Sequence, residues 1–492
     1  MKKYQFIKFI SLLLVVCTFS TLLMACQKNN EPDAGNTVST VDDDISYEFT
    51  EGVNFEGRKY TILNCLRDQW QYNAYITSHE MSSEPINNAI YVRTAWLEKT
   101  LNCKLEEHNF NIDTNELTDA YTKDVYSGSN TYSAAYLQPE KVMSEIIEGS
   151  LYPLNDISSL KLDKSYWCKE IMEETSLGNV HYSAASDAQL MHIEGTWGVL
   201  FNIQYLNDRE AELPYEMVRN GTWTIEEMHK ICRQVSNLNG DESFDFNENG
   251  NALYGFVTYW NGIGTLLYGT NGYFGKKDVM DFPYLTCNTA EFYERAQKVA
   301  DFCSDPGTFY YGKTSGYVNS YDKIFLDGRA VFMGGQLMHM ALISKTNIDF
   351  GIVPFPKYDV DQPDYNVSAS VSAPFLVVPI GCTQKEDIGL IMDAMSFEAN
   401  RTLVDVYYVD HLELKTNTGE LSADVEMIEL IRKKRSYDPL VISGFAEDLR
   451  KQMIYAVNRG GSDITSTVEN YRGYPETQIS KLKYHMTNKD KD

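Results

Sequence analysis

The first third of the chain alternates between short β-rich apolar runs and longer segments of helical periodicity. A strand is predicted at residues 60–65, which are apolar and follow a turn-like segment. A helix is predicted from Pro85, because apolar residues recur on one helical face as far as Leu101. Further strands are predicted at 103–108 and 132–137, with a helix at 115–126 between them. This βαβαβ order predicts a parallel sheet with helices on both faces.

The rest of the chain continues the same mixture of strands and helices. Residues 221–228 predict a helix start, in which Thr224 and Glu227 form a capping box and Trp223 and Met228 form a hydrophobic staple. Strands are also predicted at 350–353 and 375–379, helices at 386–398 and 423–433, and a frayed polar end at 481–492.

The apolar run at the N-terminus is of another kind. Residues 9–25 are almost wholly apolar, lysines precede them, and no acid occurs before Glu31. This pattern is typical of a secretory signal, and the run is short for a membrane span of about 20 residues. The segment Leu23-Met24-Ala25-Cys26 resembles a bacterial lipobox, whose cysteine carries a diacylglyceryl lipid. We therefore expect residues 1–25 to be removed and Cys26 to be lipidated.

The residues after Cys26 are small and polar, which predicts a flexible tether at 26–57. The protein is then expected at the extracellular face of the cell membrane, held by its lipid anchor. An uncleaved N-terminal anchor is the alternative, and it also places the rest of the chain outside the cytoplasm.

Composition narrows the classes of partner. The net charge of the 492 residues is −26, and removal of the signal takes away only cations. Such a surface repels nucleic acid and anionic lipid, which argues against both as partners. The chain is also rich in rings, with 34 tyrosines, 22 phenylalanines and 6 tryptophans. Flat amphipathic rings suit stacking on sugars, although ordinary packing is the commoner use of any one ring.

The cysteines do not point to a metal or disulfide site. Cys17 lies in the predicted signal and Cys26 is the predicted anchor, which leaves seven cysteines at wide spacings with no C-x-x-C. This pattern fits neither a zinc site nor a disulfide framework. We expect most of these thiols to be buried as small hydrophobic groups.

Several motifs follow one another in a recognisable order. They are a βαβ unit from residue 60, a strand at 132–139, Gly-Ser-Leu-Tyr-Pro-Leu at 149–154, a strand ending in Phe-Asn at 197–202, Gly-Thr-Trp-Thr at 221–224, Asn-Gly-Asp leading to Tyr-Gly-Phe within 239–256, Gly-Arg-Ala at 328–330, and a strand with Pro-Phe-Pro at 349–357. The ordered set resembles extracellular solute-binding protein family 1. Members are the substrate-capturing lipoproteins of ABC importers, most of them for sugars and oligosaccharides.

The resemblance implies an α/β fold of two periplasmic-binding-protein-like lobes. Each lobe is a sheet flanked by helices, hinge strands join the two, and the ligand lies in the cleft between them. We place one lobe at residues 58–156 plus 329–380, and the other at 157–328 plus 381–492. The resemblance also implies a monomer that binds a small carbohydrate, works with ABC permease subunits, needs no cofactor and is not an enzyme.

Candidate ligand contacts come from tryptophans near predicted strand ends, because loops beyond the carboxyl ends of strands line the cleft in open α/β sheets. In the related binders, the loop after the first strand and the region after Tyr-Gly-Phe contact the ligand. Core packing is the alternative for each ring. Polar residues nearby are candidates for bonding to hydroxyls. The full set is Trp70, Glu194, Trp197, Trp260, Asn261 and Arg329.

A polar loop has the spacing of a twelve-residue calcium site. Oxygen-bearing side chains occupy positions 1, 3, 5, 7, 9 and 12, namely Asn237, Asn239, Asp241, Ser243, Asp245 and Glu248. Position 1 is usually aspartate and position 6, here Glu242, is usually glycine. The sequence leaves two alternatives, a structural Ca²⁺ site and a polar loop without metal.

Three other functions are weighed against solute capture. Residues 307–314 fit the P-loop formula, but bulky rings fill the loop and a predicted helix precedes it. A glycan-active enzyme would need paired carboxylates, and the sequence contains no catalytic motif that identifies such a pair. A ligand sensor for a membrane kinase is the remaining alternative.

Overall fold

The computed structural model describes most of the chain from residue 46 onward. The tether predicted at 26–57 is wrong for residues 47–57, because the Tyr47 hydroxyl donates to Asp393 at 2.7 Å and Phe55 is buried. Residues from Tyr47 onward form one compact unit. Four residues singled out above, Cys26, Trp70, Asp245 and Glu248, lie outside the described residues. The structure describes residues 46–66, 75–111, 116–244, 249–307, 309–311, 320–412 and 421–488.

A four-stranded sheet forms the centre of the first lobe, in the order β12-β3-β1-β2. Strand β1 (Arg58–Leu66) runs parallel to β2 (Cys103–Asn111) and to β3 (Ala134–Leu137), which confirms the predicted parallel unit. Strand β12 (Phe375–Val377) joins from far along the chain and is antiparallel to β3.

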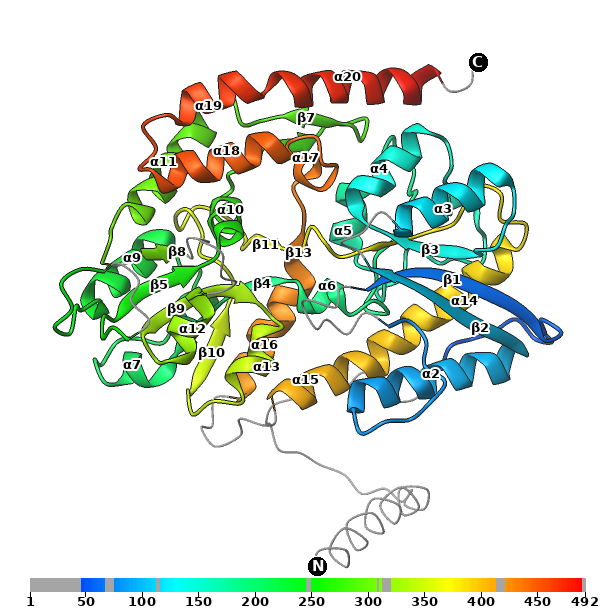
Figure 1. Cartoon of the computed structure of the whole chain (residues 1–492), viewed down its shortest axis with the longest axis horizontal. Helices are drawn as coiled ribbons and strands as arrows, with labels where there is room; N and C mark the ends of the chain where they lie inside the picture. The colour runs from blue at the N-terminus through cyan, green and yellow to red at the C-terminus, as the bar shows by residue number, and fades with distance from the viewer. Residues whose placement is uncertain are drawn as a thin grey trace, which may run out of the picture. The chain divides into compact units, whose positions relative to one another are not determined.

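Alternation along β1 directs side chains to both faces of this sheet. Tyr60 and Ile62 pack in the cluster that contains Ile86 of helix α2 (Pro85–Leu101), whereas Leu63 packs in the cluster that contains Tyr121 of α3 (Glu116–Ser127). Figure 1 shows α2 with α14 (Lys385–Glu398) on one face, and α3 with α4 (Pro139–Ile147) on the other. The helices predicted on both faces are therefore confirmed.

A five-stranded mixed sheet forms the second lobe, in the order β10-β4-β9-β5-β8. Its strands are β4 (Trp197–Asn202), β5 (Tyr254–Thr258), β8 (Phe309–Tyr311), β9 (Ala330–Gln336) and β10 (Phe350–Val353). Helix α9 (Ile225–Val235) packs on β5, and the Thr224 hydroxyl accepts the predicted capping bond from the Glu227 amide at 3.3 Å.

The lobe boundaries predicted from the sequence, at 156/157, 328/329 and 380/381, are all wrong. Residues 329–353 belong to the second sheet, because β9 and β10 both pair with β4. The segment around 157–194 belongs to the first lobe, because Ala184 pairs with Leu376 of β12 and Tyr166 bonds to Asp393 of α14. Helix α14 lies beside α2, so residues 381–398 also belong to the first lobe. Sequence periodicity marks strands but does not show which sheet each strand joins.

Two short strands lie between the sheets. β11 (Val367–Ser368) pairs in parallel with β13 (Arg435–Ser436). Helix α15 (Val404–Leu412) contacts α2, and α16 (Leu421–Lys434) contacts β10, so this part of the chain passes from the first lobe to the second.

The C-terminal residues form helices rather than a frayed end. Helix α20 (Gly473–Asn488) follows α17 (Pro439–Ile442), α18 (Glu447–Asn458) and α19 (Ile464–Tyr471). The prediction of fraying from residue 481 is wrong as far as 488, because Ile479 and Leu482, three residues apart, are both buried.

The remaining elements are short helices, a hairpin and single turns. They are the 3₁₀ turn at Leu154–Asp156, α5 (Lys169–Thr175), α6 (Met191–Glu194), α7 (Ile203–Asn207), α8 (Pro214–Arg219), α10 (Trp260–Gly269), β6 (Gly275–Lys277), β7 (Pro283–Leu285), α11 (Ala290–Cys303), α12 (Ser320–Leu326), α13 (His339–Ile343) and a π-helical turn at Ala399–Leu403.

Two further findings concern the cysteines and the length of the helices. The seven cysteines in the described part of the chain are all buried and unbridged, as predicted. None of the described helices combines the length and apolar character that crossing a membrane requires.

Candidate ligand-binding site

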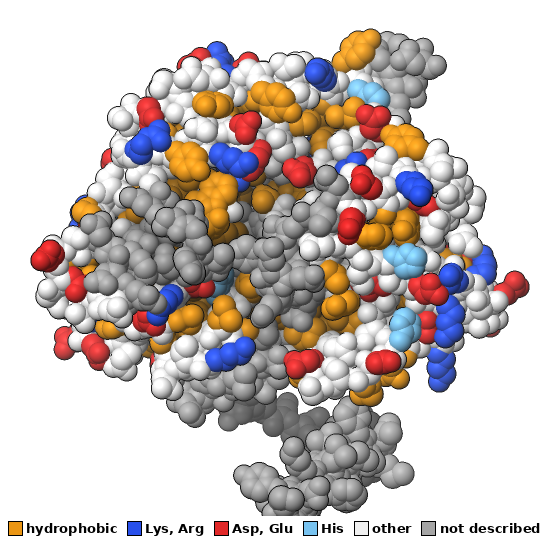
Figure 2. Space-filling view, viewed as in Figure 1, with side chains coloured by type: hydrophobic (Ala, Val, Ile, Leu, Met, Phe, Trp, Pro, Cys, Tyr) orange, Lys and Arg blue, Asp and Glu red, His pale blue; other side chains and the backbone are white. Residues whose placement is uncertain are grey.

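A cavity of about 300 Å³ lies against the second lobe and is lined mainly by rings and neutral polar groups. It is bounded by the start of β4, the N-terminal half of α10, the segment after β11, and the turn from β13 into α17. Figure 2 shows hydrophobic side chains around a hollow near the middle of the face in view. The lining includes Trp197, Tyr259, Trp260, Asn261, Tyr268, Phe274, Tyr321, Gln336, Ser368, Ser370, Ser372, Tyr437, Asp438 and Arg450.

One wall of the cavity is aromatic. The ring of Tyr259 stacks on Tyr321 with centroids 6.1 Å apart, and it meets Trp260 edge-on at 5.9 Å. Trp197, at the start of β4, lies opposite Gln336 in the β4–β9 ladder, so both side chains reach the cavity from adjacent strands. This wall offers apolar faces with hydroxyl and amide groups at their edges, which is the surface that a sugar ring requires.

Arg450 supplies the polar side of the cavity near Trp260. Its guanidinium carbon lies 5.0 Å from the centroid of the Trp260 ring, and its Nη1 donates to Asn261 Oδ1 at 3.0 Å. Glu447 holds the same guanidinium through two bonds of 2.9 and 3.0 Å. The group is therefore fixed in place and its charge is balanced by a carboxylate.

Asp438 also lines the cavity, but its carboxylate turns toward the backbone. Asp438 caps α17 by accepting from the Leu440 and Val441 amides, and it accepts from the Phe274 amide at 2.6 Å. Burial raises the pKa of Asp438 to about 6, against the opposing effect of these N–H groups. The carboxylate therefore organises the wall of the cavity.

The structure brings together three of the six predicted ligand contacts. Trp197, Trp260 and Asn261 line the same cavity. Glu194 is buried in α6 and is not part of the lining. Arg329 is not part of it either, because its Nε donates to the Ala252 carbonyl at 3.3 Å beside the polar loop at 237–252.

Sequence reasoning missed Arg450, Tyr321, Gln336 and the serines after β11. These residues come from distant parts of the chain and carry no motif. Their position depends on sheet pairing and on the packing of α18 against α10.

The described part of the polar loop is closed by its own backbone. Asp241 accepts from the Asn251 and Ala252 amides at 2.7 and 2.8 Å, and these N–H groups lower the pKa of Asp241. The structure shows no cluster of three metal-binding side chains among the described residues, but Asp245 and Glu248 lie outside them.

The calcium site stays a proposal with a direct test. If the loop binds Ca²⁺, a chelator should lower the Tm of the wild-type protein, and Glu248→Ala should abolish that response because the closing bidentate ligand is lost. Equal melting curves with calcium and with chelator would contradict the site.

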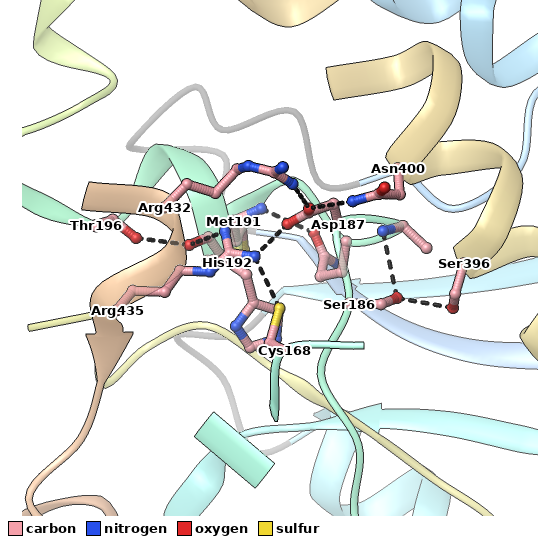
Figure 3. Close-up of polar contacts among 12 residues, drawn as sticks. Cys168, Ser186, Asp187, Met191, His192, Thr196, Ser396, Asn400, Arg432 and Arg435 are labelled. Carbon is pink, nitrogen blue, oxygen red and sulfur yellow. Dashed lines mark hydrogen bonds and ion pairs between the residues drawn. The ribbon is translucent and has the colours of Figure 1, made fainter. Parts of the chain in front are cut away.

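A buried ionic network beside α6 joins the two lobes (Figure 3). Asp187, from the first lobe, accepts from Arg432 Nη1 at 2.8 Å and also bonds to Arg435 of β13. Asp187 and Arg435 are only 2 and 4% exposed. Although burial opposes it, the two guanidinium groups lower the pKa of Asp187, so the carboxylate is ionised.

His192 adds a neutral contact to the same network. Its Nε2 lies 3.0 Å from the Pro374 carbonyl, and its backbone carbonyl accepts from Arg435. Burial lowers the pKa of His192 to about 3, so the ring is neutral. Since Pro374 immediately precedes β12, the network fixes several of the segments that pass between the lobes.

Comparisons of sequence and of structure give different results. No protein-family model matches the sequence, and comparison with the curated proteins finds no match. Solved structures do match over nearly their whole length. The ABC substrate-binding protein of Listeria monocytogenes in complex with cycloalternan has a TM-score of 0.52 at 13% identity, covering 86% of this chain and 98% of that one.

Two further structures support the same fold. The GacH receptor of Streptomyces glaucescens, solved unliganded and with acarbose, has a TM-score of 0.53 at 12% identity and covers 87% of this chain and 99% of its own. The maltose- and maltodextrin-binding MalE domain of Bdellovibrio bacteriovorus, bound to maltotriose, has a TM-score of 0.52 at 11% identity, covering 86% and 100%. The chain has the two-lobe solute-binding fold. The expected fold class is therefore confirmed.

Proposed function

We propose that this protein captures a sugar or oligosaccharide between its two lobes and delivers it to an ABC importer. The observation that carries the proposal is the cavity, which combines seven aromatic residues with neutral polar groups at a wall of the second lobe. Proteins of the same fold have been solved with cycloalternan, acarbose and maltotriose. The similar structures are binding proteins, which favours capture over catalysis as the role of this chain.

The charges around the cavity support a neutral ligand. Arg450 is balanced by Glu447, and Asp438 is directed at backbone N–H groups. An ionic ligand would have to compete with these existing partners, whereas hydroxyl groups can share them. A neutral glycan is therefore the best match.

A thermal-shift screen tests this proposal, because a ligand that binds only the folded state raises the Tm. The panel would contain neutral mono- and oligosaccharides, uronates, peptides and polyols. We expect a neutral saccharide to give the largest increase. An increase with peptides alone would overturn the proposal.

The place of the protein in the cell rests on the N-terminal sequence. We propose that Cys26 carries a diacylglyceryl lipid after removal of residues 1–25, and that residues 26–46 tether the lobes to the outer face of the membrane. At about 0.8 kcal/mol per buried CH₂, two acyl chains are a firm anchor.

The change Cys26→Ala should abolish incorporation of labelled fatty acid and release the protein from the membrane fraction. Cys168→Ala is a control, because that thiol is buried within the fold. Labelling that survives Cys26→Ala would contradict the assignment.

Transport and sensing make different demands on the same binding protein. The importer role requires ABC permease subunits as partners, and deletion of this protein should then stop uptake of the bound sugar. A sensor for a membrane kinase is the second candidate, and deletion would then alter gene expression while uptake continues. The fold is common to both roles, and the resemblance of the sequence motifs favours the importer.

A further inference from the structure

A hairpin of the second lobe reaches across to the first. The hairpin consists of β6 and β7 and spans Gly275–Leu285. Its base belongs to the second lobe, because the ring of Phe274 packs on Phe292 of α11, and α11 contacts α9 and β8 of that lobe. Lys483 of α20 holds it from outside through Asp278 at 2.8 Å. Figure 1 shows β7 beneath α20, on the same side of the molecule as α4.

Across the boundary between the lobes, the hairpin contacts residues of the first lobe. They form α5 and the turn that follows it, at 169–181. The Leu154 amide donates to the His181 carbonyl, and the Cys168 amide donates to the Ala185 carbonyl. Ala184 in turn pairs with Leu376 of the first sheet. This segment is therefore anchored to the first sheet at both of its ends.

Lys277 makes the principal contact between the hairpin and α5. Its ammonium group donates to the Glu173 carbonyl, to the Ser176 carbonyl at 2.7 Å and to the Ser176 hydroxyl at 2.8 Å. These carbonyls lie at the C-terminal end of α5, where the helix leaves acceptors unsatisfied and a cation is favoured. One lysine of the second lobe thus caps a helix of the first.

Asp281 makes the reciprocal contact. Its carboxylate accepts from the Asn179 amide at 2.8 Å and pairs with Lys277, while its backbone carbonyl accepts from the Gly178 amide. Gly178 and Asn179 both have positive φ, so the turn presents two successive N–H groups to the hairpin. The side chains of Lys277 and Asp281 are only 11 and 16% exposed, so water screens this pair weakly.

The gap beneath this contact is nearly filled. The space between α4, α5, the hairpin and α17 has a volume of about 20 Å³, which is room for about one water molecule.

We propose that the hairpin Gly275–Leu285 is a strap that holds the two lobes together before any ligand binds. Wide opening of the lobes requires Lys277 to leave the end of α5. Lys277 and Asp281 lie closer to the surface than Asp187 and Arg435, which are 2 and 4% exposed, so water can take the place of the strap contacts when the lobes part.

Distance measurements between the lobes test the strap without a ligand. Spin labels would be attached to the full mature chain at Lys123→Cys on α3 and Glu294→Cys on α11, both exposed positions on different lobes. The labelled protein is expected to give one narrow distance distribution. Adding Lys277→Met keeps the apolar stem and removes the ammonium group, so the distribution should become broader and shift.

Lys276→Met is the matched control. Lys276 is the preceding residue of the same strand, is exposed, and lies 5.0 Å from the ring of Tyr273 within the second lobe. The substitution Lys276→Met removes the same charge but no contact between the lobes. The distance distribution should therefore equal that of the labelled protein without it. Asp281→Asn is a second strap variant that should also broaden it, and it decides the matter if Lys277→Met fails to melt cooperatively.

An unchanged distribution in the strap variants would overturn the proposal, and so would an equal change in Lys276→Met. The test does not depend on sugar binding. A protein that binds no sugar but opens on loss of Lys277 would contradict the proposed function and support the strap.

Discussion

Replacing Asp187 by asparagine is expected to lower the free energy of unfolding by about 3–5 kcal/mol, because it leaves the buried Arg435 and its neighbour Arg432 without their shared carboxylate. The neutral amide can accept a hydrogen bond but cannot compensate two guanidinium charges in a site that excludes water. Urea denaturation at neutral pH, read as a shift of the transition midpoint, measures the loss.

An exposed ion pair is the appropriate control for this variant. Lys59 and Glu106 pair at 3.1 Å across β1 and β2, with side chains 58 and 46% exposed. Glu106→Gln should therefore cost at most about 1 kcal/mol. Equal effects from Asp187→Asn and Glu106→Gln would contradict the view that the buried network is a main attachment between the lobes.

Replacing Trp260 by alanine is expected to weaken sugar binding by about five- to a hundredfold. That range corresponds to about 1–3 kcal/mol, by analogy with a ring stacked on a base. The ring is partly exposed at the cavity, and Arg450 lies over it. The fold should survive, since the cavity wall retains Tyr259 and Tyr321. Calorimetric titration beside a melting curve measures affinity and stability separately.

Trp223 offers a comparison within the core. It is fully buried and donates from Nε1 to the Pro354 carbonyl at 2.9 Å. Trp223→Ala should reduce the free energy of unfolding by about 3–5 kcal/mol and leave the affinity of the folded protein nearly unchanged. If Trp260→Ala shows this same pattern, Trp260 belongs to the core and the proposed stacking is wrong.

Local elements were predictable because they depend on neighbours in the sequence. The helix N-cap at Thr224, the helix start at Pro85 and the strand predicted at 60–65, which spans Arg58–Leu66, all follow from periodicity and turn chemistry. The allocation of strands to lobes was not predictable in this way. Strand β9 is as apolar as a strand of either sheet, and only its pairing with β4 and β5 decides where it lies.

The candidate site was predictable only in part, for the same physical reason. Trp197 and Trp260 stand out as large rings near strand ends, and both line the cavity. Arg450 is one charged residue among many on a C-terminal helix, and it reaches the cavity because α18 packs against α10. Arg329 was a candidate for bonding to ligand hydroxyls, but its Nε donates to the Ala252 carbonyl beside the polar loop.

The central claim is that the cavity binds a neutral sugar, and calorimetric titration of the mature wild-type protein tests it most directly. The titrant would be the saccharide that gives the largest increase in Tm. We predict saturable binding at one site per chain, weakened by Trp260→Ala. Absence of binding heat at several temperatures for every saccharide, together with saturable binding of a peptide or another class of ligand, would contradict it.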